Sequence, residues 1–112
     1  MVLVKRNPAL GVEEFHAEWR AHGRMIADEP VFHRYIRRYE QHHRLSADYG
    51  GALYQGEEFD GVAVQWFDSF ADFLAMLDTP EYAAKMQPDE GRILDLPNMV
   101  ILMTEEAEVF IG

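Results

Sequence analysis

Residues 60–67 read DGVAVQWF and residues 99–103 read MVILM, and these two apolar runs decide the fold class. The Asp-Gly pair that opens the first run is a turn signal, and both runs have the length and composition of strands. Runs with so few polar residues are typical of strands that are covered on both faces. We therefore expect a strand at 62–67 and a last strand from about Met99 to Phe110.

Two further strands are expected in the first half of the chain. Residues 2–4, a short apolar run, precede an Asn-Pro breaker. Residues 32–44 contain aromatic and β-branched residues and favour a second strand. Alternation along that strand places Tyr35, Arg37 and Tyr39 on the same face. A loop at 46–60 follows, and loops of this length often line functional sites.

Apolar periodicity predicts one helix between these two strands. It begins after Gly11, where two acidic residues suit the N-terminus of a helix, and it ends before Pro30. One helical stripe, at i, i+4, i+7 and i+11, should face the core. The stripe consists of Phe15, Trp19, His22 and Ile26.

Helical segments are also expected between residues 69 and 93. Ser69 with Asp72 three positions later resembles a capping box, and it opens a helix with four apolar residues inward: Phe70, Phe73, Leu74 and Leu77. Pro80 suits the first position of another helical segment. Pro88 should kink or end that segment.

The order of these elements predicts one domain over residues 1–112. It is an α+β, ferredoxin-like βαββαβ fold, with an antiparallel four-stranded sheet and helices on one face. The opposite face of the sheet is then left bare. Because a chain of 112 residues has nothing more to cover it, we expect a homodimer that packs sheet against sheet.

Composition and charge exclude several classes of function. There are 20 acidic and 10 basic residues, so a basic nucleic-acid-binding face is not expected. The absence of cysteine excludes a disulfide framework and a thiolate nucleophile. The sequence has neither a run of ~20 apolar residues nor a signal-peptide pattern, so we expect no membrane association and a cytoplasmic location.

The histidine spacing argues against a metal site. His16 and His22 are six residues apart and lie on different faces of a helix, whereas His42 and His43 are neighbours on a strand and point to opposite sides. The sequence also lacks a phosphate-binding glycine loop and a dinucleotide fingerprint. We therefore expect neither a metal nor a cofactor.

Seven short motifs in a fixed order resemble a known family. They are EEF at 13–15, WRAH at 19–22, RYI at 34–36, DGV at 60–62, WFDS at 66–69, TPEY at 79–82 and DE at 89–90. Together they are similar to the EthD family over roughly residues 1–104. The resemblance implies a dimeric α+β barrel. Relatives in that family include a methylmuconolactone methylisomerase and polyketide-tailoring dehydratases or decarboxylases that work without a cofactor.

The resemblance also implies two site residues. In the isomerase-like members, a helix histidine and a tyrosine on the next strand line the pocket, and His22 and Tyr35 match those positions. His22 is either a general acid or base or a hydrogen-bonded core histidine. Tyr35 either donates to a developing oxyanion or packs in the sheet. Glu18, four residues before His22, is either an acceptor for its ring or an exposed, unrelated acid.

The remaining candidates would bind the substrate, a small hydrophobic molecule. Arg37 either pairs with a substrate carboxylate or is a solvated strand charge. Five aromatic or aliphatic residues are expected to line the pocket: Trp19, Ile26, Tyr39, Trp66 and Phe73. We expect a cofactor-independent lyase or isomerase that acts on a small hydrophobic oxygenated metabolite. The alternatives are a non-catalytic binding or accessory module and a small monooxygenase.

Overall fold

The computed structural model of the chain describes residues 1–50 and 58–112. The sheet and the main helices succeed one another in the order expected from the sequence. They are β1 (Val2–Val4), α1 (Val12–Asp28), β2 (Ile36–His43), β3 (Gly61–Phe67), α2 (Phe70–Leu77), α3 (Gln87–Ile93) and β4 (Val100–Ile101). Shorter helical turns connect them, and none of the described helices is long and apolar enough to cross a membrane.

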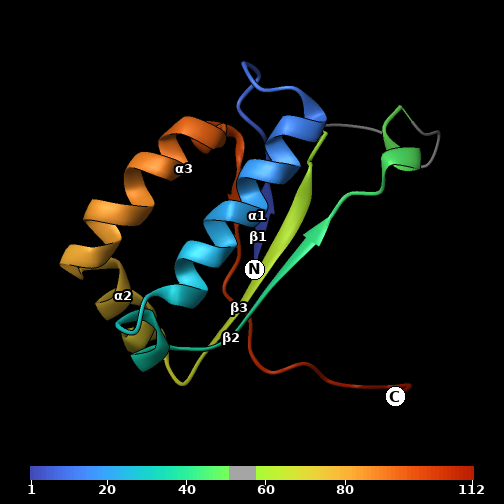
Figure 1. Ribbon diagram of the computed structural model, residues 1–112. Coiled ribbons are helices and arrows are strands. Elements are labelled where there is room, and N and C mark those ends of the chain that lie inside the picture. Colours follow the sequence, from blue (N-terminus) through green and yellow to red (C-terminus); the bar gives the residue numbers. More distant parts are fainter. Residues whose placement is uncertain (51–57) are drawn as a thin grey trace.

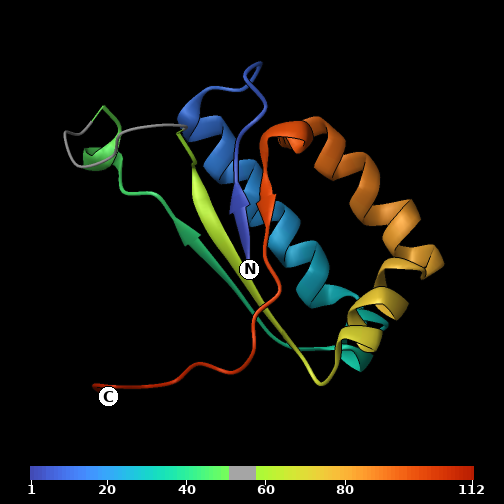
Figure 2. The ribbon, with the colours of Figure 1, turned by 180° about the vertical axis from the view of Figure 1, so that it is seen from behind.

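The four strands form one antiparallel sheet in the order β2-β3-β1-β4. Val2 is paired with Ala63 of β3 on one side and with Ile101 of β4 on the other. The helices lie on one side of this sheet (Figures 1 and 2). The prediction of an α+β, ferredoxin-like fold is therefore confirmed.

Helix α1 fixes the core because its apolar stripe meets the sheet. Phe15 and Trp19 are almost completely buried and pack with Val4, Ala63 and Ile93. A second cluster, at the other end of the helix, contains Ile26, Phe32, Met76 and Met86. Between the two clusters, the stripe carries the buried His22.

The expected strand at 32–44 begins later than predicted. Phe32–Arg34 form a 3-10 turn, η1, and Tyr35 is the residue that ends it. The amide of Tyr35 donates to the Phe32 carbonyl oxygen at 3.1 Å, a turn bond rather than a strand bond. This turn buries Phe32 in the second core cluster, and that burial outweighs the strand propensity of its neighbours.

A β-bulge at the start of β2 changes which side chains share a face. Ile36 pairs with Phe67 and Arg38 pairs with Trp66, so Arg37 is an extra residue without a partner position. Ile36 and Tyr39 consequently both face the helices. The predicted alternation that placed Tyr35, Arg37 and Tyr39 on one face is wrong, because the bulge interrupts the period of two.

The helical segments after β3 differ from the prediction in two respects. The Ser69 hydroxyl accepts from the Asp72 amide at 3.1 Å, as the capping pattern predicts. However, Phe70 and Leu74 are exposed rather than inward, because it is Met76 that α2 buries in the core. Pro88 does not end its helix. It lies in the first turn of α3, where no amide is needed, directly after the π-helical segment η3 (Tyr82–Met86).

The last strand is much shorter than expected. β4 pairs with β1 through Val100 and Ile101, and the Leu102 amide donates to the Met1 carbonyl oxygen at 2.8 Å. Beyond this point the chain is exposed and runs out on the side of the sheet opposite the helices (Figures 1 and 2). Of the predicted loop at 46–60, Ser46–Asp48 form a 3-10 turn and residues 51–57 lie outside the described residues.

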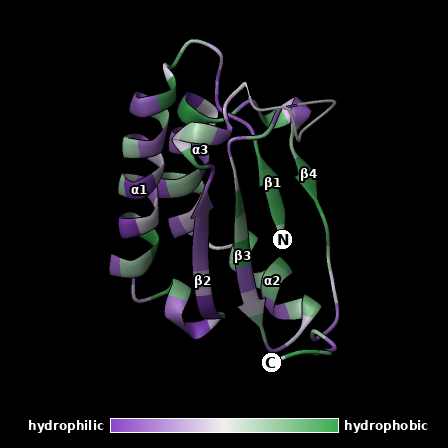
Figure 3. Cartoon of the chain, turned by 90° about the vertical axis from the view of Figure 1, so that its right-hand side faces the viewer, coloured by the Kyte–Doolittle hydropathy of each residue, from purple (hydrophilic) through white to green (hydrophobic). Residues whose placement is uncertain are grey.

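The face of the sheet away from the helices is open. Figure 3 views the sheet from this side, with β2 mostly hydrophilic and β1 and β4 hydrophobic. The register places five apolar side chains on this outer face: Leu3, Val62, Val64, Trp66 and Val100. Trp66 and Val100 are 42% and 45% exposed, so the outer face is not covered within one chain.

Candidate active site

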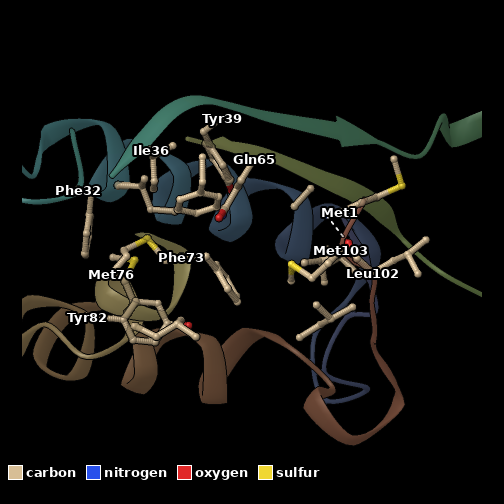
Figure 4. Close-up of a pocket in the computed structure, with 18 of the residues that line it drawn as sticks. Met1, Phe32, Ile36, Tyr39, Gln65, Phe73, Met76, Tyr82, Leu102 and Met103 are labelled. Carbon is tan, nitrogen blue, oxygen red and sulfur yellow. Dashed lines mark hydrogen bonds between the residues drawn. The ribbon is translucent and has the colours of Figure 1, made fainter. Parts of the chain in front are cut away.

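A cavity of about 700 Å³ lies between the helices and the inner face of the sheet. Figure 4 shows Tyr39 and Gln65 on the sheet side of this cavity and Tyr82 on the helical side. Most of the lining is apolar, contributed by α1, α2, η3 and the sheet. A cavity of this size, with few polar groups among apolar walls, is typical of a small-molecule site.

His22 lines the cavity and is held by an acidic partner. It is 5% exposed, and its Nδ1 lies 2.8 Å from Asp89 Oδ2. Burial opposes ionisation of Asp89, but hydrogen bonds from Arg92 and His22 lower the pKa of its carboxyl. Because this carboxylate accepts a hydrogen bond from Nδ1, the ring proton lies on Nδ1. The lone pair of Nε2 is then available to a molecule in the cavity. Asp89 therefore sets both the orientation and the tautomer of His22.

Arg92 holds Asp89 in place from the outside. Its Nη2 lies 2.8 Å from Asp89 Oδ1 and 2.8 Å from Glu18 Oε2. One of the two alternatives drawn from the sequence made Glu18 the acceptor for the His22 ring. Instead, Glu18 acts on the arginine, and the acceptor for the ring comes from α3.

Glu90 supplies a second ionisable group beside the histidine. Its Oε1 lies 3.9 Å from His22 Nε2, and the Tyr82 hydroxyl donates to both of its carboxylate oxygens at 2.9 Å. Burial is the main reason that the pKa of Glu90 is raised, although the bond from Tyr82 opposes the rise. A carboxyl of this kind holds a proton at higher pH than an ordinary glutamate and can act as an acid.

Tyr39 presents a hydroxyl to the same cavity. Its oxygen accepts from Gln41 Nε2 at 2.9 Å, and the same amide group donates to the Trp19 carbonyl oxygen at 2.7 Å. Burial raises the pKa of Tyr39, so the hydroxyl keeps its proton. With Gln41 bound to its oxygen, Tyr39 has a proton available for an oxygen atom of a bound molecule.

A comparison with family models matches residues 7–97 to the EthD domain. The match covers most of the chain. This protein belongs to the EthD domain family. No curated protein matches the sequence. The family assignment agrees with the motif resemblance, and it identifies no reaction.

The EthD domain brings some of the predicted site residues together and separates others. His22, Trp19, Ile26, Tyr39 and Phe73 line the cavity. Tyr35, Arg37 and Trp66, all described residues, lie outside this lining.

Each of the three separated residues has a different environment. Tyr35 packs against the second core cluster. Arg37 is partly exposed and binds Asp68, with Nη2–Oδ2 at 2.8 Å. Trp66 is on the outer face of the sheet, where the Arg38 guanidinium lies 5.5 Å from its ring centre. Tyr35 lies in the turn before β2, and the β-bulge at Arg37 separates it from the face that carries Tyr39.

Asp89, Glu90 and Tyr82 are site residues that the sequence reasoning did not single out. The sequence did contain an indication of these three residues, because they belong to the motifs TPEY and DE that resemble the family. What was absent was any indication that α3 would return across α1. The Asp89–His22 contact spans 67 residues of sequence.

A second polar cluster of the EthD domain lies beside the cavity. His16 Nε2 is 2.9 Å from the Tyr49 hydroxyl oxygen, and this hydroxyl donates to Asp60 Oδ1 at 2.7 Å. His43 contacts the other nitrogen of His16 and also Gln41, so the cluster reaches the residue that binds Tyr39. Within residues 1–50 and 58–112, no group of three or more acidic or histidine side chains could hold a metal ion.

Proposed function

We propose that this EthD domain catalyses cofactor-independent proton transfer, as a lyase or isomerase, on a small hydrophobic oxygenated molecule. The observation that carries the proposal is the His22–Asp89 pair, whose free Nε2 lies at the cavity beside Glu90. A buried imidazole oriented by a carboxylate is the usual arrangement of a general base that works near neutral pH.

The first chemical step would use His22 and Tyr39. His22 Nε2 takes a proton from a carbon next to a carbonyl, and the electrons of that C–H bond form a C=C bond. The carbonyl oxygen gains the negative charge and receives a hydrogen bond from the Tyr39 hydroxyl. Such a donor is effective because it is already oriented when charge develops.

Glu90 would complete the reaction as an acid. Its proton goes either to another carbon, which gives an isomer, or to a departing hydroxyl group, which leaves as water. The proton on His22 Nε2 can then pass to the Glu90 carboxylate, 3.9 Å away, and this transfer restores both groups. The raised pKa of Glu90 favours the protonated form that this step requires.

Tyr39 takes the role that the family resemblance gave to Tyr35. Its hydroxyl lines the cavity and has its acceptor side filled by Gln41, whereas Tyr35 packs beside the second core cluster. The two tyrosines thus offer a matched pair for testing which hydroxyl acts on the substrate.

The test uses 2-tetralone, an uncharged bicyclic ketone with acidic hydrogens next to its carbonyl. Exchange of these hydrogens in deuterated water is followed by NMR. The EthD domain should accelerate the exchange, and His22→Ala should lower the accelerated rate by ~100-fold or more, the usual scale for a general base. A folded His22→Ala variant with an unchanged rate would remove His22 from the mechanism.

A non-catalytic binding module is the second candidate, and the largely apolar wall of the cavity favours it. In that case 2-tetralone would bind, but its hydrogens would exchange at the rate measured without protein. Measuring both the binding of 2-tetralone and the exchange rate of its hydrogens therefore separates the two candidates.

We also propose that the EthD domain acts as a homodimer whose two sheets pack through their outer faces. Trp66 and Val100 are large apolar residues that one chain leaves 42% and 45% exposed. The strands that carry them have no covering layer on this side. Packing against a second copy would bury them, and it would leave the cavities on the other faces of the two sheets.

A further inference from the structure

The charged groups around the cavity are predominantly of one sign. Four of the residues that line it carry carboxylates: Asp68, Glu90, Glu105 and Glu106. Among the described residues of the lining there is no lysine and no arginine. Asp68, Glu105 and Glu106 are exposed at the rim of the cavity, and the more buried Glu90 is the proton-bearing acid of the proposed mechanism. An anion inside the cavity would therefore have no lysine or arginine of the described lining to neutralise it.

Of three cationic groups near the cavity in the described part of the chain, two are paired with carboxylates and the third is exposed to solvent. Arg37 binds Asp68 and lies outside the lining. Arg92 is shared between Glu18 and Asp89. The amine of Met1, at the edge of the cavity, is exposed and donates to the Leu102 carbonyl oxygen at 3.0 Å (Figure 4).

His22 also offers no site for an anion. Its Nδ1 faces Asp89 at 2.8 Å, and its Nε2 faces Glu90 at 3.9 Å, so both ring nitrogens are directed at acidic side chains. An anion beside Nε2 would therefore lie next to Glu90. Burial of a charge without a partner of opposite sign is strongly unfavourable.

We propose that the cavity accepts uncharged ligands and rejects anions, so that the substrate carries no carboxylate, phosphate or sulfonate group. This inference rests on the proposed function only in placing the substrate in this cavity. It narrows the substrate class to neutral ketones, phenols, ethers or esters. It also replaces the role considered for Arg37, because that side chain is directed to Asp68.

Two fluorescent probes that differ by one anionic group provide the test. N-phenyl-1-naphthylamine is uncharged, and 8-anilinonaphthalene-1-sulfonate has the same rings with a sulfonate. Each is titrated with the wild-type chain, and only the fluorescence that 2-tetralone displaces is counted as binding in the cavity. The uncharged probe should bind at least ~10-fold more tightly than the sulfonate.

A charge-removing variant tests the cause of this preference. The double variant Glu105→Gln, Glu106→Gln removes two carboxylates of the lining that take no part in the proposed mechanism. It should tighten binding of the sulfonate probe by several-fold and leave binding of the uncharged probe within twofold. Glu108→Gln is the matched control, since Glu108 is exposed and outside the lining, and it should change neither affinity. Equal affinities for the two probes in the wild-type chain, or tighter binding of the sulfonate, would overturn the inference. So would the absence of displaceable binding by either probe.

The outcome is independent of catalysis. A chain that prefers the uncharged probe but does not accelerate exchange in 2-tetralone would contradict the proposed function and support the charge selectivity. A chain that accelerates exchange and binds both probes equally would support the proposed function and contradict the charge selectivity.

Discussion

The Nδ1 atoms of His16 and His43 lie 2.7 Å apart, so one ring donates a proton and the other accepts it. Gln41 determines the tautomer of His43. Its amide nitrogen donates to the Trp19 carbonyl oxygen, and its amide oxygen therefore accepts from His43 Nε2 at 2.9 Å. His43 thus carries its proton on Nε2, and its Nδ1 faces His16.

This pair should make the fold sensitive to acid. Burial lowers the pKa of His16 and, with the nearby charge of Arg20, lowers the pKa of His43 to about 4. In the unfolded chain both rings have the ordinary value of 6.5. The unfolded state therefore binds more protons as the pH falls below 6.5, and the free energy of unfolding should decrease from there towards pH 4. Urea titrations at pH 7, 6, 5 and 4 measure this decrease.

Two histidine variants on the same strand separate this effect from general acid denaturation. His43→Gln removes a half-buried ring and should reduce the loss of stability between pH 6.5 and 4. His42→Gln removes an exposed ring that contacts Glu40 and should leave the loss as in the wild-type chain. An equal loss in the His43→Gln variant and the wild-type chain would contradict the assignment.

The sequence predicted those features that depend on neighbours along the chain. The stripe from Phe15 to Ile26 specified α1 and its buried face, and Ser69 with Asp72 specified the start of α2. The succession of strands and helices along the chain followed from the alternation of apolar patterns. These signals are local, and the tertiary structure did not override them.

The features that were missed depend on tertiary contacts. The 3-10 turn that ends at Tyr35 and the bulge at Arg37 have no signature in their own residues, and together they leave Tyr39 but not Tyr35 in the cavity lining. Asp89 meets His22 only because α3 packs against α1. Periodicity could place His22 on an inward face, but it could not identify the acid that would meet it there.

Gly61 should tolerate no side chain. A Cβ atom at this position would lie 2.5 Å from the His42 carbonyl oxygen and 2.5 Å from Trp19 Cζ3. Since one neighbour is backbone of the adjacent strand and the other is a buried core ring, Gly61→Ala should lower the free energy of unfolding by ~1–3 kcal/mol, as overpacking usually does. Gly91→Ala, in α3 with open space around it, should instead raise it by ~0.5–1 kcal/mol. Urea titration of both variants measures the contrast, and a neutral Gly61→Ala would contradict the packing argument.

Gly23 allows Gln41 to approach helix α1. A Cβ atom at this position would lie 2.7 Å from Gln41 Nε2, so Gly23→Ala should displace the amide that binds Tyr39. We expect exchange in 2-tetralone to slow by ~10- to 100-fold, because small displacements of catalytic groups have effects of this size. Gly91→Ala serves as the helix-glycine control and should keep the wild-type rate. Wild-type exchange in the Gly23→Ala variant would show that Gln41 does not position the hydroxyl.

Tyr39→Phe removes the hydroxyl without changing the ring. If this hydroxyl binds the oxygen that becomes negative, the exchange rate should fall by ~100- to 1,000-fold, the scale observed for the loss of one oxyanion donor. Tyr35→Phe should keep the rate within twofold, because Tyr35 lies outside the cavity. If Tyr35→Phe lowered the exchange rate and Tyr39→Phe did not, Tyr35 would be the hydrogen-bond donor.

Trp66 tests the proposed dimer, because it lies on the outer face at 42% exposure beside the Arg38 guanidinium. Trp66→Glu places a charge on the proposed contact surface, and the nearby Arg38 can pair with it, so the chain itself should remain folded. Loss of a tryptophan from the centre of an interface usually costs ~2 kcal/mol or more, which corresponds to a ~30-fold weaker dimer. Sedimentation equilibrium should show twice the mass of one chain for the wild type and a shift towards the single-chain mass for Trp66→Glu. Leu45→Glu introduces the same charge at a leucine that is 74% exposed and not on the sheet, and it should sediment like the wild type. A wild-type chain that sediments as a single copy at micromolar concentration would mean that the outer face is not a dimer interface.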